Sequence, residues 1–407
     1  MEIRKNEVVQ ASNQVNVRIV AGGVVALAVA MGIGRFAFTP LLPLMLRDEL
    51  ISVEVGAEWA AANYLGYLIG AVTATRLPGD PKRSLNLSLL GVALTTLALA
   101  LLDKELPVWL GAILRGAAGV FSAWALISTS IWGLTELARR RVPELGAWIY
   151  IGVGMGIMLS GTLSWLGGSQ PVHWLWLEMG LFGAAGALFV RVSLGHIGGG
   201  SDLASPALTR PSLREHLPVV LCYGVFGFGY IIPATFLPVM ARQQIDDPLV
   251  FGLTWPIFGL AAALSVVVVA RYLSSRSRRY IWAVAHTVMA LGTALPLVFS
   301  SIWSLALSSL LVGGTFMVAT MAGLQLARER LPENPGPLLA LMTIAFAAGQ
   351  IFGPLFVRLL GLLSAGWNPL VAANAVASAL LLTSAAWLWR GSDASTKERV
   401  RSHCGGK

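Results

Sequence analysis

Hydrophobic runs of about twenty residues recur along the whole chain, separated by short clusters of charged and turn-forming residues. A run of about 20 apolar residues can cross a bilayer as an α-helix. The runs are continuous and do not alternate with polar residues, so they favour helices over the strands of a membrane barrel. Cutting the chain at the polar clusters predicts spans at residues 17–46, 57–76, 84–102, 107–135, 144–167, 174–194, 217–240, 249–272, 280–300, 303–327, 337–363 and 368–390.

The longest internal polar stretch divides these twelve predicted spans six and six. It covers residues 195–216 and is typical of a flexible cytoplasmic linker, here between a first bundle at 17–194 and a second at 217–390. Residues 1–16 are polar and are predicted to be a cytoplasmic segment, because the apolar run after them is too long for a cleaved signal. Residues 391–407 are predicted to be a cytoplasmic tail. We therefore expect an all-α integral membrane protein with twelve transmembrane helices in two bundles.

Composition agrees with this class, and charge orients the chain. Of the 407 residues, 56% are hydrophobic and only 12% are charged, against about 25% charged in a soluble domain. With the N-terminus inside, nearly all of the 29 Lys and Arg residues fall at cytoplasmic ends of spans. Because loops rich in Lys and Arg stay in the cytoplasm, both termini are predicted to be cytoplasmic. The net charge of +9 then reflects this bias and gives no reason to expect nucleic-acid binding. The outer ends hold only Arg47, Lys104, Arg242 and Arg358.

Several other functional classes lack the residues they need. Cys222 falls in a span and Cys404 in the tail, so the two cysteines form no disulfide framework. The sequence supplies no clustered metal ligands, no nucleotide-binding loop and no ATPase motif. We expect no enzyme activity, no metal and no cofactor, and any uphill transport has to draw on an ion or solute gradient.

The two halves of the chain repeat each other at an offset of 195 residues. The run GIGRFAFTPLLPLM from Gly32 aligns with GFGYIIPATFLPVM from Gly227, and the same offset brings Phe121 onto Phe316. Both copies begin on the same side of the membrane, because six spans separate them. Parallel repeats of this kind, with a binding site near the midplane between the halves, characterise one large transporter architecture.

These runs resemble the major facilitator superfamily over nearly the whole chain. Within it, GIGRFAFTPLLPLM, AANYLGYLIGA (residues 61–71), GFGYIIPATFLPVMA and GGTFMVATMAGLQLAR are similar to the YbfB/YjiJ family. The resemblance implies alternating access, solute transport in the bacterial inner membrane, and a central cavity lined by spans one, four, seven and ten. LRGAAG around Arg115 also resembles the fourth-span motif of the superfamily, in which a glycine, here Gly119, follows an arginine by four residues.

Two arginines, Arg35 and Arg115, fall inside the predicted spans. Each lies eleven or twelve residues inward of the basic residue at the outer end of its span. At 1.5 Å per residue, both are roughly 16–18 Å below the outer ends, close to mid-bilayer. A mid-membrane arginine costs about 2.5–3.5 kcal/mol even on a lenient insertion scale. The repeat places Tyr230 and Leu310 at the matching positions, so the fold itself does not require this positive pair.

The functional interpretation of this pair is a binding site for an anionic solute such as a carboxylate. A guanidinium is planar, stays charged at any working pH and fits that shape. The alternative is structural, since Arg115 in particular could hydrogen-bond backbone carbonyls freed by the glycines and Pro40 of span one. An ion pair is disfavoured, because the only candidate acids, Glu58 and Glu178, fall near the outer ends of their spans.

Four uncharged residues are further candidates for substrate binding. Asn63 and Tyr67 share a face of span two, Tyr230 matches Arg35 in the repeat, and Gln350 lies in the middle of span eleven. For each, the alternative is a hydrogen bond between helices, which is the commoner fate of a polar residue in a membrane bundle.

We therefore predict a secondary active transporter of a small organic anion, working by alternating access in the lipid bilayer. Its link to protons stays open: the substrate carries the proton, Glu58 or Glu178 lies deeper than the spans indicate, or the protein exchanges anions or works passively. Two other classes remain. One is an efflux transporter for drugs or other amphiphiles, disfavoured because span five, GVGMGIMLSG from Gly152, lacks the proline typical of many drug/proton antiporters. The other is a sensor that keeps a transporter fold.

Overall fold

Polar side chains cap the first turn of several helices in this chain. The computed structural model describes residues 2–74, 80–102, 107–195, 213–242, 253–273, 275–299, 301–363 and 368–404. At the start of α4 (Pro81–Leu99) the Asp80 carboxylate accepts the N–H of Lys82, and at the start of α11 (Arg278–Val298) the Ser277 hydroxyl accepts that of Tyr280. Each side chain satisfies a backbone donor that the first helical turn leaves unpaired.

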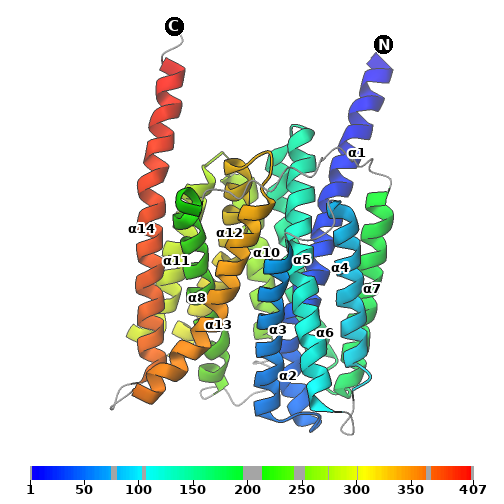
Figure 1. Cartoon of the computed structure of the whole chain (residues 1–407), viewed down its shortest axis with the longest axis vertical. Helices are drawn as coiled ribbons and strands as arrows, with labels where there is room; N and C mark the ends of the chain where they lie inside the picture. The colour runs from blue at the N-terminus through cyan, green and yellow to red at the C-terminus, as the bar shows by residue number, and fades with distance from the viewer. Residues whose placement is uncertain are drawn as a thin grey trace.

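Twelve helical passes run along the bundle in the described part of the chain (Figure 1). The first pass joins α1 (Glu2–Leu27), the π-helix η1 (Ala28–Phe36) and α2 (Phe38–Arg47), and the fifth joins the 3-10 helix η3 (Pro143–Tyr150) to α6 (Ile151–Leu166). Besides α4 and α11, the remaining passes are α3 (Val53–Thr73), α5 (Val108–Arg139), α7 (Val172–Gly195), α8 (Leu213–Arg242), α10 (Thr254–Tyr272), α12 (Ile302–Arg330), α13 (Gly336–Leu363) and α14 (Pro369–Cys404).

The predicted all-helical class is confirmed. Ten of these passes are long and apolar enough to cross a membrane, and α3 and α4, with 21 and 19 residues, are not among those ten. The helix of the first pass begins at Glu2 and that of the last ends at Cys404, so the backbone is helical within both predicted polar ends. Most of the predicted linker, residues 196–212, lies outside the described residues.

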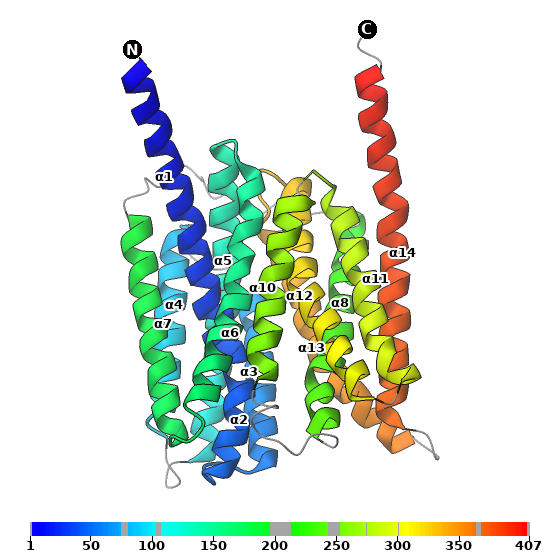
Figure 2. The same cartoon turned by 180° about the vertical axis from the view of Figure 1, so that it is seen from behind.

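The passes form two bundles, α1 to α7 and α8 to α14 (Figures 1 and 2). In the first bundle α5 packs against α3 and α4, and α4 packs against α7; in the second, α8 packs against α13 and α11 packs against α12 and α14. The bundles meet along two pairs of helices, α6 with α10 and α3 with α13. Both termini lie at the same end of the molecule, as an even number of passes requires.

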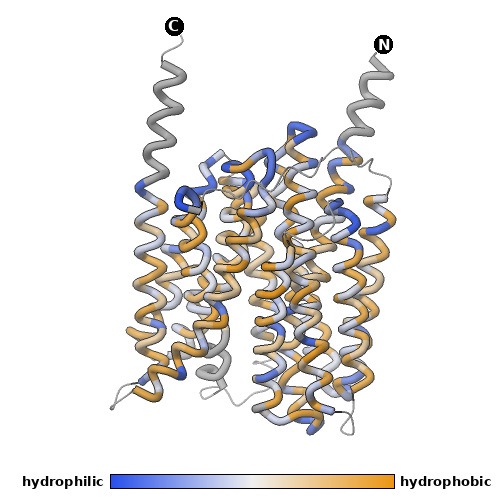
Figure 3. Tube along the Cα trace, viewed as in Figure 1, coloured by the Kyte–Doolittle hydropathy of each residue, from blue (hydrophilic) through white to orange (hydrophobic). Residues whose placement is uncertain are grey.

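Hydropathy marks the part of the surface that faces lipid. Hydrophobic residues follow the length of the helices, and hydrophilic ones gather chiefly at the end where α1 and α14 extend (Figure 3). Large apolar side chains such as Leu65, Leu94, Leu188 and Leu264 are about half exposed on the outside of the bundle. Water would penalise such a surface and hydrocarbon would not. The fold is therefore that of a multi-pass membrane protein.

Glycines bring α6 and α10 together where the two bundles meet. A Cβ atom on Gly154 would lie 2.4 Å from the backbone nitrogen of Ala263, and one on Gly259 would lie 2.3 Å from that of Met158. The two backbones are therefore in direct contact, which only small residues allow.

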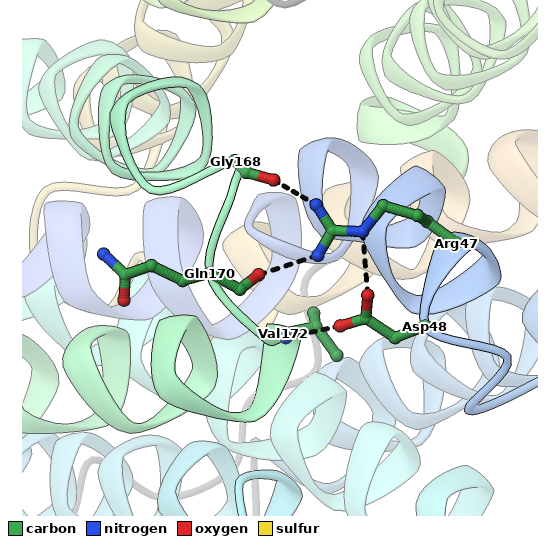
Figure 4. Close-up of polar contacts among 5 residues, drawn as sticks. All are labelled: Arg47, Asp48, Gly168, Gln170 and Val172. Atoms are coloured by element: carbon green, nitrogen blue, oxygen red, sulfur yellow. Dashed lines mark hydrogen bonds and ion pairs between the residues drawn. The ribbon is translucent and has the colours of Figure 1, made fainter.

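The end of α2 is tied to the loop between α6 and α7 at the opposite end from the termini (Figure 4). The Arg47 guanidinium donates to the carbonyl oxygens of Gly168 and Gln170 and, over 2.7 Å, to the Asp48 carboxylate. Asp48 in turn accepts the N–H of Val172 over 2.7 Å, so its carboxylate satisfies a donor at the start of α7. These contacts close this end of the first bundle.

Candidate substrate-binding site

The π-helix η1 carries Arg35 into the centre of the molecule. Two glycines lie within it, and a Cβ atom on Gly32 would come within 2.3 Å of the backbone of Gly156 in α6. Pro40 has no N–H, so carbonyls four and five residues before it lose a backbone donor. The π-helix η1 is nine residues long, and π segments, which are rare and mostly a single turn, occur frequently at functional sites.

Side chains from α5 and α3 satisfy several carbonyls of this segment. Arg115 donates through Nη1 to the carbonyl oxygen of Gly34 and through Nη2 to that of Arg35, both over 3.1 Å. Ser122 donates to the carbonyl of Ala30 over 2.7 Å, and Asn63 donates to that of Gly34 over 3.4 Å and to that of Arg115 over 2.9 Å. Arg115 is only 2% exposed, and its guanidinium also lies 4.7 Å from the ring centre of Phe38. These contacts brace the backbone that carries Arg35.

Arg35 itself is buried between the two bundles. Its side chain is 3% exposed, and its Nη2 donates to the Oε1 of Gln350 in α13, across the boundary between the halves. Its carbon Cζ lies 4.0 Å from the ring centre of Tyr67, a cation–π contact. The Nε and Nη1 atoms have no hydrogen-bond partner. A buried cation with two unpaired donors is costly unless a further group satisfies it.

Aromatic rings surround the guanidinium on several sides. The rings of Phe36, Tyr64 and Phe346 have their centres 5.6–5.8 Å from Cζ of Arg35. Beyond them, Tyr230 stacks on Phe316 at 4.7 Å, and the Phe36 ring meets the Phe316 ring edge-on at 5.8 Å. The centre of the molecule therefore combines one charged group with an aromatic wall drawn from both halves.

The structure brings the six candidates from the sequence together at the centre. Arg35 contacts Tyr67 and Gln350 directly, Arg115 donates to its carbonyl oxygen, and Asn63 donates to the carbonyl oxygen of the preceding residue, Gly34. Tyr230 lies one ring further away, where it packs against Phe346 at 6.3 Å. All six side chains are buried. The Arg115 guanidinium reaches the carbonyl of Arg35, so the two arginines lie side by side.

Sequence reasoning missed four rings of this wall: Phe36, Tyr64, Phe316 and Phe346. A single aromatic residue in an apolar span gives no sign of whether it faces lipid or a neighbouring helix. For Phe316 the sequence did hold a signal. It is the counterpart of Phe121 in the repeat and lies on the tenth span, which the family resemblance places beside the cavity, so it could have been expected to line the site.

Acidic side chains stay away from this centre. Among the described residues, no aspartate or glutamate side chain is buried. Glu58 on α3 is exposed, and Glu178 on α7 is only partly buried. No carboxylate within ion-pair distance of Arg35 is found in the described part of the chain.

One histidine, His286 of α11, is fully buried inside the second bundle. The Nε1 of Trp282 donates to its Nε2 over 2.7 Å, and its Nδ1 lies 3.0 Å from the hydroxyl of Ser384. Because an indole can only donate, Nε2 has to accept, so the ring proton lies on Nδ1 and the imidazole is neutral. Both ring nitrogens of His286 are therefore occupied by hydrogen bonds within the second bundle.

The fold and its charged centre define a class, the helical transporters built from two bundles of six passes. The chain belongs to the family described as "Uncharacterised MFS-type transporter YbfB", whose model matches residues 27–388, and this confirms the resemblance seen in the sequence. The crystal structure of the human organic anion transporter MFSD10 (TETRAN) is similar in fold, with a TM-score of 0.67 and 16% identity, over 93% of this chain and 99% of that chain. No curated protein sequence matches the chain.

Proposed function

We propose that this protein is a secondary transporter of a small organic anion, and that Arg35 binds the anionic group. The observation that carries the proposal is the buried Arg35 guanidinium, which has two unpaired N–H groups and no nearby carboxylate in the described part of the chain. An anion would satisfy those donors and lower the cost of burying the charge.

The two arginines take different roles in this proposal. Nη1 and Nη2 of Arg115 already donate to backbone carbonyls, so Arg115 holds the π-helix and fixes where Arg35 points. It is a positioning residue. This leaves one guanidinium, that of Arg35, free to meet the substrate.

Binding at Arg35 is linked to the contact between the halves. A guanidinium offers a carboxylate two donor edges, Nη2 with Nε or Nη2 with Nη1, and Nη2 belongs to both. In this structure Nη2 donates to Gln350. Nη2 carries two N–H groups, one on each edge, so a carboxylate that takes the edge occupied by Gln350 displaces the Gln350 oxygen and breaks a hydrogen bond between the bundles. This supports alternating access, in which one bundle rocks against the other around a central site.

The proposal extends to the orientation of the chain in the membrane and to the link between transport and protons. The basic ends of the spans and the hydrophilic end seen in Figure 3 support a cytoplasmic location for both termini in a bacterial inner membrane. We expect any proton that accompanies transport to travel on the substrate, since no acidic side chain is buried among the described residues and the imidazole of His286 is held neutral by Trp282 and Ser384.

The test pairs thermal stability with ligand affinity in purified protein. A thermal-shift screen against organic acids, phosphates, amines and drugs first identifies an anion that raises the melting temperature. Arg35→Gln should keep a melting temperature near that of the wild type, yet abolish the ligand-induced shift and transport in vesicles. Arg35→Lys should weaken affinity but retain some transport, because it keeps the charge and loses the flat two-donor edge.

Arg115→Gln is the matched control, since it removes an equally buried arginine at the same depth. Normal anion affinity in a destabilised Arg35→Gln protein would overturn the proposal. A melting response to organic cations that is unaffected by Arg35→Gln would instead favour efflux of amphiphiles, and ligand binding without uptake into vesicles would favour a sensor.

A further inference from the structure

We infer that the transported anion carries a single negative charge on a flat, apolar ring, as an aromatic monocarboxylate does. This inference rests on the proposed function, because it describes the body of the molecule whose anionic group Arg35 binds. It is carried by the number of free charges at the centre, the rings around them and the scarcity of other free polar atoms.

The charge at the centre fits one anionic group. Arg115 is committed to the carbonyls of Gly34 and Arg35, and its guanidinium packs over the Phe38 ring. Arg35 has two unpaired nitrogens, Nε and Nη1, whereas Arg115 has only its Nε unpaired. A second carboxylate or a doubly charged phosphate would therefore enter a buried site where both amino groups of the neighbouring Arg115 are already bonded to backbone carbonyls, at a high desolvation cost.

The walls beside Arg35 are ring faces from both halves. Tyr67 and Tyr64 come from α3 and Phe36 from the first pass, while Phe346 comes from α13 and Phe316 from α12. When Gln350 leaves Arg35 and the halves separate, the space beside the guanidinium is bounded by these faces. A flat ring attached to the bound carboxylate can stack there, and an aromatic pair contributes beyond the area it buries.

Few polar atoms are free to meet hydroxyl groups on a substrate. Besides those of Arg35 itself, four unpaired ones lie near it: the Tyr67 hydroxyl, Nε of Arg115, Nε2 of Gln350 and Oδ1 of Asn63. A sugar acid or a sugar phosphate would bring several hydroxyls that lose water without finding partners, each at a cost. An apolar ring avoids that cost and gains from leaving water.

The experiment compares carboxylates of similar size on the full-length protein. The probes are benzoate, hexanoate, phthalate as a dianion, gluconate as a hydroxylated acid and benzylamine as a cation. We expect benzoate to bind about two- to tenfold more tightly than hexanoate, which is the ratio that one or two ring contacts supply. Phthalate, gluconate and benzylamine should bind more weakly than either.

Ring variants test the wall itself. Phe346→Leu and, separately, Phe316→Leu should reduce the preference for benzoate over hexanoate, while leaving binding dependent on Arg35. Phe352→Leu is the matched control, because this ring lies on the same helix as Phe346 but is 53% exposed on the outside. Using two variants keeps the test valid if one of them folds poorly.

The outcomes separate the two proposals. Equal affinity for benzoate and hexanoate, both lost in Arg35→Gln, would overturn this inference and leave the proposed function standing. Tighter binding of phthalate or gluconate than of benzoate would overturn it as well. Binding of none of these anions, together with normal transport by Arg35→Gln, would overturn the proposed function itself.

Discussion

Two arginines at one depth of this protein meet the cost of burial in different ways. Arg115 donates to the backbone carbonyls of Gly34 and Arg35 in the π-helix. Arg35 keeps unpaired donors and contacts rings and the neutral oxygen of Gln350. The same residue type therefore stabilises the fold at one position and remains available to a ligand at the other.

Arg115→Gln should destabilise the protein by about 1–3 kcal/mol, because the carbonyls of Gly34 and Arg35 then lose charged donors in a buried place. The loss in free energy of anion binding should be smaller than the loss in free energy of unfolding, since the Arg35 side chain is still present. Melting temperature and anion affinity, measured together, check this. An unchanged melting temperature with lost affinity would show that Arg115 contacts the substrate instead.

Element by element, the sequence predicted the helices but not their irregularities. Continuous apolar runs predict helices because only the hydrophobic pattern matters at that level. The π-helix η1 depends on what lies beside it: Gly156 of α6 approaches Gly32, and Arg115 of α5 reaches the carbonyls. The pairing of Arg35 with Gln350 likewise joins residues 315 positions apart. No local pattern holds this information, although the 195-residue repeat indicated which passes to compare.

Gly32→Ala should destabilise the first bundle, since its Cβ would lie 2.3 Å from the Cα of Gly156, where backbone has to move. We expect a loss of about 1–3 kcal/mol, typical of overpacking, read as a lower melting temperature. Gly314→Ala is the control: nothing lies within 4 Å of its Cβ position, so it should be neutral or slightly stabilising. Equal melting temperatures for the two variants would argue against the tight approach of η1 and α6.

The contacts at the end of α2 predict a pH effect on stability. The hydrogen bond from Arg47 and the N–H of Val172 lower the pKa of Asp48 below its ordinary value of 3.8. A lowered pKa in the folded state adds stability above the unfolded value, and that stability is lost as pH falls through the folded pKa. Asp48→Asn should therefore melt below the wild type at pH 7, and the gap should narrow below about pH 4. Glu58→Gln, which removes an exposed carboxylate outside these contacts, is the matched control.

At the scale of the whole molecule, two features decide how it works: its orientation in the membrane and the contact between its halves. Orientation rests on the basic residues of the loops, and the contact rests on α6 with α10, α3 with α13, and the hydrogen bond from Arg35 to Gln350. The orientation can be tested without knowing the substrate. The contact between the halves can be tested once the thermal-shift screen has identified a ligand.

Single cysteines test the orientation. In a protein with Cys222 and Cys404 replaced by serine, Ser275→Cys should resist a membrane-impermeant thiol reagent in intact cells. Ser169→Cys, exposed in the loop between α6 and α7 at the opposite end, should react. The reverse pattern would invert the topology and place the termini outside.

Gln350→Leu tests the contact between the halves. Without its oxygen, the empty carrier has to close around an Arg35 guanidinium whose Nη2 has lost its acceptor, so reorientation without substrate should slow. Net efflux from vesicles should fall more than exchange of anion for anion, in which the substrate itself meets Arg35. A parallel loss of both rates would show that Gln350 only binds substrate. Labels on the outer ends of α2 and α8 should report two distance populations, shifted by ligand.

The unpaired charge on Arg35 also has an electrical consequence. A bound monoanion lowers the net charge of the binding site at Arg35 by one. The loaded and the empty carrier therefore respond differently to membrane voltage. One elementary charge crossing 100 mV corresponds to about 2.3 kcal/mol, enough to change a rate by more than tenfold. Vesicles with an imposed potential should therefore show voltage-dependent net transport and voltage-independent exchange, which makes the membrane potential itself a control on the direction in which this carrier runs.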